Sequence, residues 1–136
     1  MTQLMPLLAL GLAALAGPTF AGDAAVGEEV FNKCKACHSV IADDGTEFQK
    51  GGKTGPNLYG VIGRPVASVP GFKYGEGILA VGATGAVWDE ASLAAYVANT
   101  AAWLQEQTGD SAAKSRMSFK LAEGGADVAA YLASVR

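Results

Sequence analysis

The stretch Cys34-Lys35-Ala36-Cys37-His38 decides how this chain folds. Two thiols stand three residues apart, about one helical turn, and an imidazole follows at once. With this spacing both sulfurs can reach the same edge of a flat macrocycle while the imidazole projects over its centre. Cys-x-x-Cys-His is the attachment motif of c-type haem. The motif therefore predicts one covalent haem c on Cys34 and Cys37, with His38 bound to its iron.

Other interpretations of the two cysteines fit less well. A structural zinc ion normally takes four protein ligands, and the chain has only two Cys and one His. A redox-active Cys-x-x-Cys usually accompanies a βαβ unit, whereas the residues before the motif have helical periodicity. A structural disulfide between Cys34 and Cys37 would close a very short loop. We therefore favour haem attachment.

The small number of Met residues in the chain points to a second iron ligand. Beyond residue 21, Met117 is the only Met in the chain. A lone Met usually fills a core, but this one lies in the polar run 114–120, outside any apolar helical stripe. Ligation by His and Met is typical of electron-carrying haem proteins. Because both axial positions would then be occupied, we expect electron transfer rather than catalysis. The alternative, a haem enzyme or gas sensor, needs an iron site that is easily vacated.

Residues 1–21 have the layout of a secretory signal peptide. They contain no charged side chain, and an apolar run at 4–16 is followed by Gly17-Pro18 and then by Thr19-Phe20-Ala21. No Lys or Arg precedes the run, which departs from the usual pattern. The run is shorter than the ~20 apolar residues that span a bilayer. We expect cleavage near Ala21, a domain at 22–136 and a periplasmic location; the alternative is a retained membrane anchor.

The rest of the chain predicts one small, all-α domain. Ten basic and thirteen acidic residues give a net charge of −3, with no basic excess for binding nucleic acid. Strand signals are weak. The Gly-rich stretch 38–72 is too long for an ordinary connection, so we expect it to wrap an apolar cofactor. Helices are expected at 23–37, at 73–80, from 89 with a separate short helix through 103–104, and from about 126.

Four runs resemble the class I c-type cytochromes, most closely bacterial cytochrome c2. The resemblance covers residues 22–136 and implies the small cytochrome c fold, in which the N- and C-terminal helices cross and loops wrap one haem. Gly27 and Phe31 should then meet Val128 and Tyr131. The runs that carry the resemblance are residues 27–38, 53–64, 71–74 and 117–121.

The resemblance implies roles for haem-pocket residues. The Pro56 carbonyl would accept a hydrogen bond from His38 and fix its imidazole. Tyr96 would lie near the Met sulfur and Phe119 would cover the haem edge. Without the resemblance, core packing would explain the aromatic residues equally well. Three residues match those that satisfy a haem propionate, which is costly to bury unpaired: Arg64, Tyr74 and Trp88.

The resemblance also implies partners. The donor would be a membrane quinol–cytochrome c oxidoreductase, the acceptor a photosynthetic reaction centre or a terminal oxidase, and the carrier a monomer without stable membrane insertion. A basic face around the haem edge would steer docking onto acidic partners. We define the lysine face as seven of the ten basic residues: Lys33, Lys50, Lys53, Lys73, Lys114, Arg116 and Lys120.

The chain also departs from the family pattern. Ala101 and Ala102 stand where Lys is frequent, which thins the lysine face. Asn99-Thr100 stands where an acidic residue or Asn is often followed by Pro. The loops 42–50 and 108–115 are longer than in mitochondrial cytochrome c.

Overall fold

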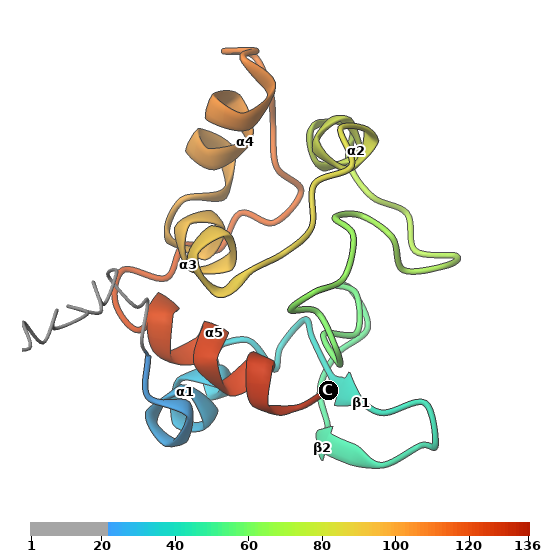
Figure 1. Ribbon diagram of the computed structural model, residues 1–136, viewed down its shortest axis with the longest axis vertical. Helices are drawn as coiled ribbons and strands as arrows, with labels where there is room; N and C mark the ends of the chain where they lie inside the picture. Colours follow the sequence, from blue (N-terminus) through green and yellow to red (C-terminus); the bar gives the residue numbers. More distant parts are fainter. Residues whose placement is uncertain (1–21) are drawn as a thin grey trace, which may run out of the picture.

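The computed structural model describes residues 22–136, so the expected signal peptide lies outside the described part. Helices dominate the described chain (Figure 1), as the sequence predicts. Within residues 22–136, no helix is both long enough and apolar enough to cross a membrane. The elements are α1 (Ala24–Val30), a 3-10 helix η1 (Phe31–Lys33), β1 (Val40–Ile41), β2 (Glu47–Gln49), α2 (Glu76–Ala83), α3 (Glu90–Ala98), α4 (Thr100–Thr108) and α5 (Gly125–Ser134).

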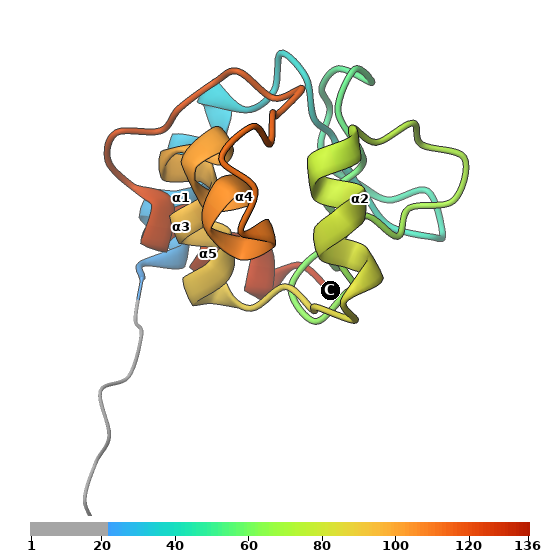
Figure 2. The same cartoon turned by 90° about the horizontal axis from the view of Figure 1, so that it is seen from above.

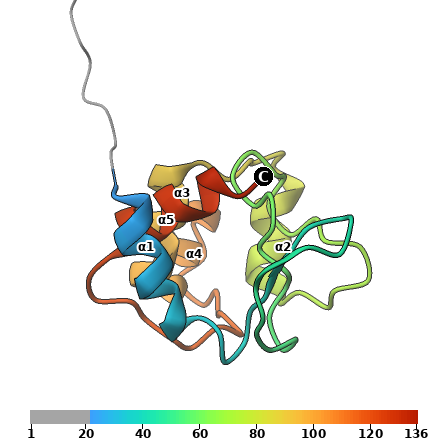
Figure 3. The same ribbon diagram turned by 90° about the horizontal axis from the view of Figure 1, so that it is seen from below.

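The first and last helices cross, which confirms the predicted contact (Figure 3). A Cβ on Gly27 would lie 1.9 Å from the Asp127 carbonyl oxygen, so only glycine allows this approach. One turn later, the rings of Phe31 and Tyr131 pack with their centroids 5.8 Å apart. Phe31 is fully buried, and α5 packs on α3 as well. Helices α1, α3 and α5 thus share one core.

Helices α3 and α4 each begin at a polar N-cap residue, Asp89 and Asn99. Asp89 accepts a hydrogen bond from the Ser92 amide at 2.7 Å, and the Ser92 hydroxyl accepts one from the Asp89 amide at 3.0 Å. This reciprocal pair starts α3 at the predicted position. Asn99 has extended backbone (φ −159°), which ends α3, and its side chain caps α4 by accepting from the Ala102 amide. The two helices are therefore separate, as expected.

Helix α2 begins later than the sequence predicts. We expected a helix at 73–80, and the structure has it at Glu76–Ala83. The difference comes from Tyr74, whose hydroxyl accepts a hydrogen bond from the Val69 amide at 3.0 Å and so belongs to the preceding loop. Gly75 then acts as the N-cap. Figure 2 shows α2 and the loops before it on one side of the molecule and the other helices on the opposite side.

A two-stranded hairpin interrupts the stretch that was expected to be irregular. In the antiparallel pair β1–β2, Val40 faces Gln49 and Ile41 faces Glu47. The Asn57 side chain accepts from the Ile41 amide at 3.0 Å and donates to its carbonyl at 2.7 Å, so it occupies the free edge of β1. Local sequence did not reveal this hairpin because a residue from a later loop supports it.

Candidate haem site

An apolar cavity of 310 Å³ opens between the two sides of the molecule. Segments from both sides contribute to its walls, including residues of α2, α3, α4 and α5 and of the loops between 54 and 75. The structure therefore brings together nine of the ten residues that the sequence singled out. These nine lining residues are Cys34, Cys37, His38, Pro56, Arg64, Tyr74, Trp88, Tyr96 and Met117.

His38 is held in the form that a metal ligand needs. Its Nδ1 lies 2.8 Å from the Pro56 carbonyl oxygen. A carbonyl only accepts, so Nδ1 carries the proton and Nε2 keeps its lone pair. Burial lowers the pKa of His38, against the opposing effect of the Pro56 carbonyl, which keeps the imidazole neutral. A Cβ on Gly55 would lie 2.3 Å from the His38 Cε1, so the glycine makes room for the ring.

The two cysteines lie on the turn that follows η1. The Cys34 amide donates to the Phe31 carbonyl at 2.8 Å, and the His38 amide donates to the Cys34 carbonyl at 2.9 Å. This turn places both free thiols at the cavity wall, Cys34 half-buried and Cys37 exposed. Burial raises the pKa of Cys34, and the neighbouring Cys37 raises it further. We expected the Cys-x-x-Cys-His motif at the end of a helix, but in the structure it lies on a turn.

Met117 reaches the same cavity from an irregular segment fixed by two hydroxyls. Its carbonyl accepts from the Thr100 Oγ1 at 2.6 Å and from the Ser115 Oγ at 2.9 Å. The Met117 amide donates to the Ser115 Oγ at 3.1 Å. These contacts could not be predicted from the sequence, because Thr100 resembles an ordinary first residue of a helix.

Comparison with known proteins decides the family. No family model matches the chain. It is 61% identical over 121 residues to the cytochrome c2 of Rhodobacter capsulatus, covering 89% of this chain and 88% of that protein. It is 63% identical over 114 residues to the cytochrome c-550 of Paracoccus versutus, covering 82% and 74%. The chain belongs to the class I c-type cytochromes, close to cytochrome c2. It is therefore an electron carrier and not an enzyme, with one covalent haem c as its cofactor.

The fold of this c-type cytochrome agrees with solved relatives. The structure of Rhodobacter capsulatus cytochrome c2 superposes with a TM-score of 0.83 at 60% identity, covering 84% of this chain and 98% of that one. Ferric cytochrome c-550 from Paracoccus versutus gives 0.82 at 62% identity, with coverage of 84% and 98%. The predicted fold class is confirmed.

Arg64 tests whether the cavity suits the haem of a c-type cytochrome. Its terminal nitrogens donate to the backbone carbonyls of Tyr59 and Asn57 at 3.1 and 3.2 Å. Its Nε is buried and has no hydrogen-bond partner within residues 22–136. Burial lowers the pKa of Arg64 by disfavouring its charged form, and an anion beside it would offset this cost. Because Arg64 lines the cavity, this unpaired donor fits a haem propionate, and the apolar walls fit the porphyrin.

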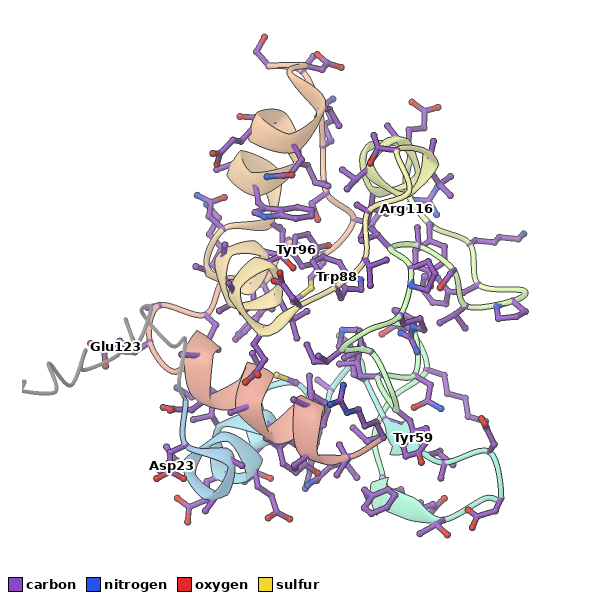
Figure 4. The ribbon with its side chains drawn as sticks, in the orientation of Figure 1. Asp23, Tyr59, Trp88, Tyr96, Arg116 and Glu123 are labelled. Carbon is purple, nitrogen blue, oxygen red and sulfur yellow. The ribbon has the colours of Figure 1, made fainter. Side chains whose placement is uncertain are left out.

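Aromatic rings form a cluster beside the cavity of the cytochrome (Figure 4). Trp88 and Tyr96 line the cavity, and their centroids are 5.2 Å apart. Trp103 stacks on Trp88 at 5.1 Å and meets Tyr96 edge-on at 5.3 Å. All three are buried, and burial raises the pKa of Tyr96, which keeps its phenol neutral. Trp103 could not be predicted from the sequence as a support of the pocket, because it packs behind the residues that line the cavity.

Phe119 is the one predicted pocket residue that the structure does not place in the cavity wall. Its side chain is 43% exposed. It follows Met117 closely in the chain, so it lies near the site without lining it. Its role in covering the haem edge stays a prediction.

Proposed function

We propose that this cytochrome carries single electrons in the periplasm with His38 and Met117 as the axial ligands. When bound, haem iron takes up and releases one electron. The observation that carries the proposal is that a neutral imidazole and the only Met of the described chain line one apolar cavity. Pro56 holds the first ligand, and Thr100 and Ser115 hold the segment of the second. Ligands kept in place during redox cycling favour fast transfer.

Optical spectra of the purified holoprotein test the ligation. We expect a sharp α-band when the protein is reduced and a weak band near the red edge when it is oxidised. Met117→Ala should abolish the weak band and, because Met raises the potential, lower the reduction potential.

A wild-type haem spectrum without the weak band would reject Met117 as the ligand. Tight binding of carbon monoxide to the reduced wild type would favour the alternative, a haem enzyme or gas sensor. The absence of visible absorption after maturation in a haem-attaching host would contradict the assignment of the cofactor to this site.

The charges around the cavity support docking through the lysine face. All seven of its side chains are exposed. Three of them, Lys73, Lys114 and Arg116, also line the cavity, and Arg116 donates to the Lys73 carbonyl at 3.1 Å. Figure 4 shows Arg116 beside α2. The protein is acidic overall, so this basic rim would give it a dipole that steers acidic partners. We propose a quinol–cytochrome c oxidoreductase as donor and a reaction centre or terminal oxidase as acceptor.

Rates of reduction by membranes that contain the donor test this surface. The second-order rate should fall as ionic strength rises. Lys73→Glu and Lys114→Glu should each slow the reaction several-fold at low salt. Arg136→Glu is the matched control, because it makes the same charge change outside the lysine face. Equal effects of all three variants, or rates that do not depend on salt, would reject the docking surface.

We further propose that the protein is exported as a monomer after cleavage near Ala21. The intact mass of the periplasmic form should then correspond to residues 22–136, and sedimentation should give one copy. A mass that retains residues 1–21, together with recovery in the membrane fraction, would support the anchored alternative.

A further inference from the structure

The carbonyl of Met117 accepts a hydrogen bond from a residue outside its own segment. Thr100 lies 17 residues away in the chain, yet its Oγ1 donates to this carbonyl at 2.6 Å, and the Thr100 side chain is 1% exposed. A short hydrogen bond that is shielded from water is stronger than an exposed one. Ser115 adds a second donor at 2.9 Å, but it lies only two residues from Met117, in the same irregular segment.

Thr100 is well placed to be an anchor. It is the first residue of α4, directly after the Asn99 cap. The residues after Met117 are fixed to α3, because the Leu121 amide donates to the Val97 carbonyl at 2.8 Å. The Met117 segment is therefore tied at two points to the same α3–α4 corner.

The contact differs from the usual hydrogen bond of a helical threonine. A threonine hydroxyl inside a helix commonly bonds back to the carbonyl four residues earlier. Thr108, at the other end of α4, does this, and its Oγ1 donates to the Leu104 carbonyl at 2.7 Å. Thr100 is the first residue of α4, so no earlier turn of this helix offers it a carbonyl. Its hydroxyl donates instead to the Met117 carbonyl, which lies in a different segment.

We propose that Thr100 is a positioning residue that keeps Met117 in the cavity and so limits how often the ligand is released. This inference rests on the proposed ligation by Met117. Without the Thr100 hydroxyl, the Met117 carbonyl keeps only Ser115 as donor, and the segment opens more often. An external ligand that competes for the same position binds with an apparent affinity proportional to the open fraction.

Imidazole binding to the ferric holoprotein, followed by absorbance, measures this open fraction. Thr100→Val has the same shape but lacks the hydroxyl and should bind imidazole about fivefold tighter, which is the change that a net ~1 kcal/mol hydrogen bond produces. Thr100→Ser keeps the donor and should behave as the wild type does. Thr100→Pro should behave as the valine variant does, because Pro is favoured at the first helical position and the extended Asn99 tolerates it.

Thr108→Val is the matched control. It removes a threonine hydroxyl from the same helix without touching the Met117 segment, so it should lower the free energy of unfolding and leave imidazole affinity near the wild-type value. Equal tightening in Thr100→Val and Thr108→Val would overturn the proposal, since general loosening would then explain both. Unchanged affinity in Thr100→Val and Thr100→Pro would also overturn it.

The red-edge band of the wild type separates this inference from the proposed function. If the band is present and Met117→Ala removes it, unchanged imidazole binding in the Thr100 variants rejects only the anchor. If the wild type lacks the band, the ligation by Met117 fails and the anchor fails with it.

Discussion

At the scale of the residue, the position of the His38 imidazole depends on the absence of a side chain at Gly55. His38 is only 9% exposed, and its ring lies against Gly55. The same short loop supplies the Pro56 carbonyl that orients the ring. Gly55 thus gives the His38 ring its space, and the adjacent Pro56 sets the orientation of the ring.

Gly55→Ala should disturb this arrangement. Its Cβ would lie 2.3 Å from the His38 Cε1, closer than van der Waals contact allows, so the ring or the loop must shift. We expect a loss of about 1–3 kcal/mol in the free energy of unfolding of the holoprotein, together with a perturbed haem spectrum. Denaturant titration and absorbance measure both. Gly75→Ala is the control, because its Cβ meets only the flexible Arg116 side chain, at 3.2 Å; an equally large loss there would contradict the explanation.

At the scale of the element, the crossing of α1 and α5 permits no side chain at Gly27. A Cβ there would overlap the Asp127 carbonyl, which is backbone and cannot rotate away. Gly27→Ala should therefore force the helices apart and cost about 3 kcal/mol, at the upper end for overpacking, despite the better helix propensity of Ala. Val26→Ala, on the exposed side of α1, should cost less than about 1 kcal/mol. Thermal unfolding of both variants tests the difference; similar costs would contradict it.

The Asp89 N-cap of helix α3 makes a contribution to the free energy of unfolding that depends on pH. The Ser92 backbone amide and hydroxyl lower the pKa of Asp89, so the capping contribution is present above the ordinary carboxyl pKa of about 3.9 and is lost as pH falls through the lowered value. Asp89→Ala should destabilise the protein by about 1 kcal/mol at pH 7, and the gap to wild type should narrow below about pH 4. Asp89→Asn keeps a cap that does not titrate. A gap that stays constant into acid would rule out the charged cap.

Elements that local sequence specifies were predictable, and those that distant contacts specify were not. The haem motif and the start of α3 at Asp89 depend on residues within a turn of each other. The hairpin depends on Asn57, and the start of α2 depends on Tyr74 joining the loop before it.

The features of the site likewise fall into those that the sequence predicts and those that depend on distant contacts. Composition alone singled out His38 and Met117, because the candidate ligands are so few, and the structure places both in the cavity wall. The Thr100 anchor and the stack of Trp103 on Trp88 exist only once α4 is folded against its neighbours. No pattern within the Met117 segment indicates them.

At the scale of the whole molecule, the cofactor completes the core. Without the haem, the apolar walls of the 310 Å³ cavity would face water, and burial of apolar surface is the main stabilising contribution of a small domain. We therefore expect the protein expressed without haem maturation to lose fixed tertiary packing. Near-UV circular dichroism should be largely lost and thermal unfolding should be broad. A cooperative transition at a temperature close to that of the holoprotein would contradict this.

The crossing of the first and last helices has a consequence for synthesis. Because α1 packs on α5, the helix at Ala24–Val30 meets its main partner only once Gly125–Ser134 has been made. In a chain made from its N-terminus, this contact therefore forms late in synthesis. Until it forms, the Cys-x-x-Cys-His stretch, which directly follows η1, lacks the packing of α5 on the helix before it.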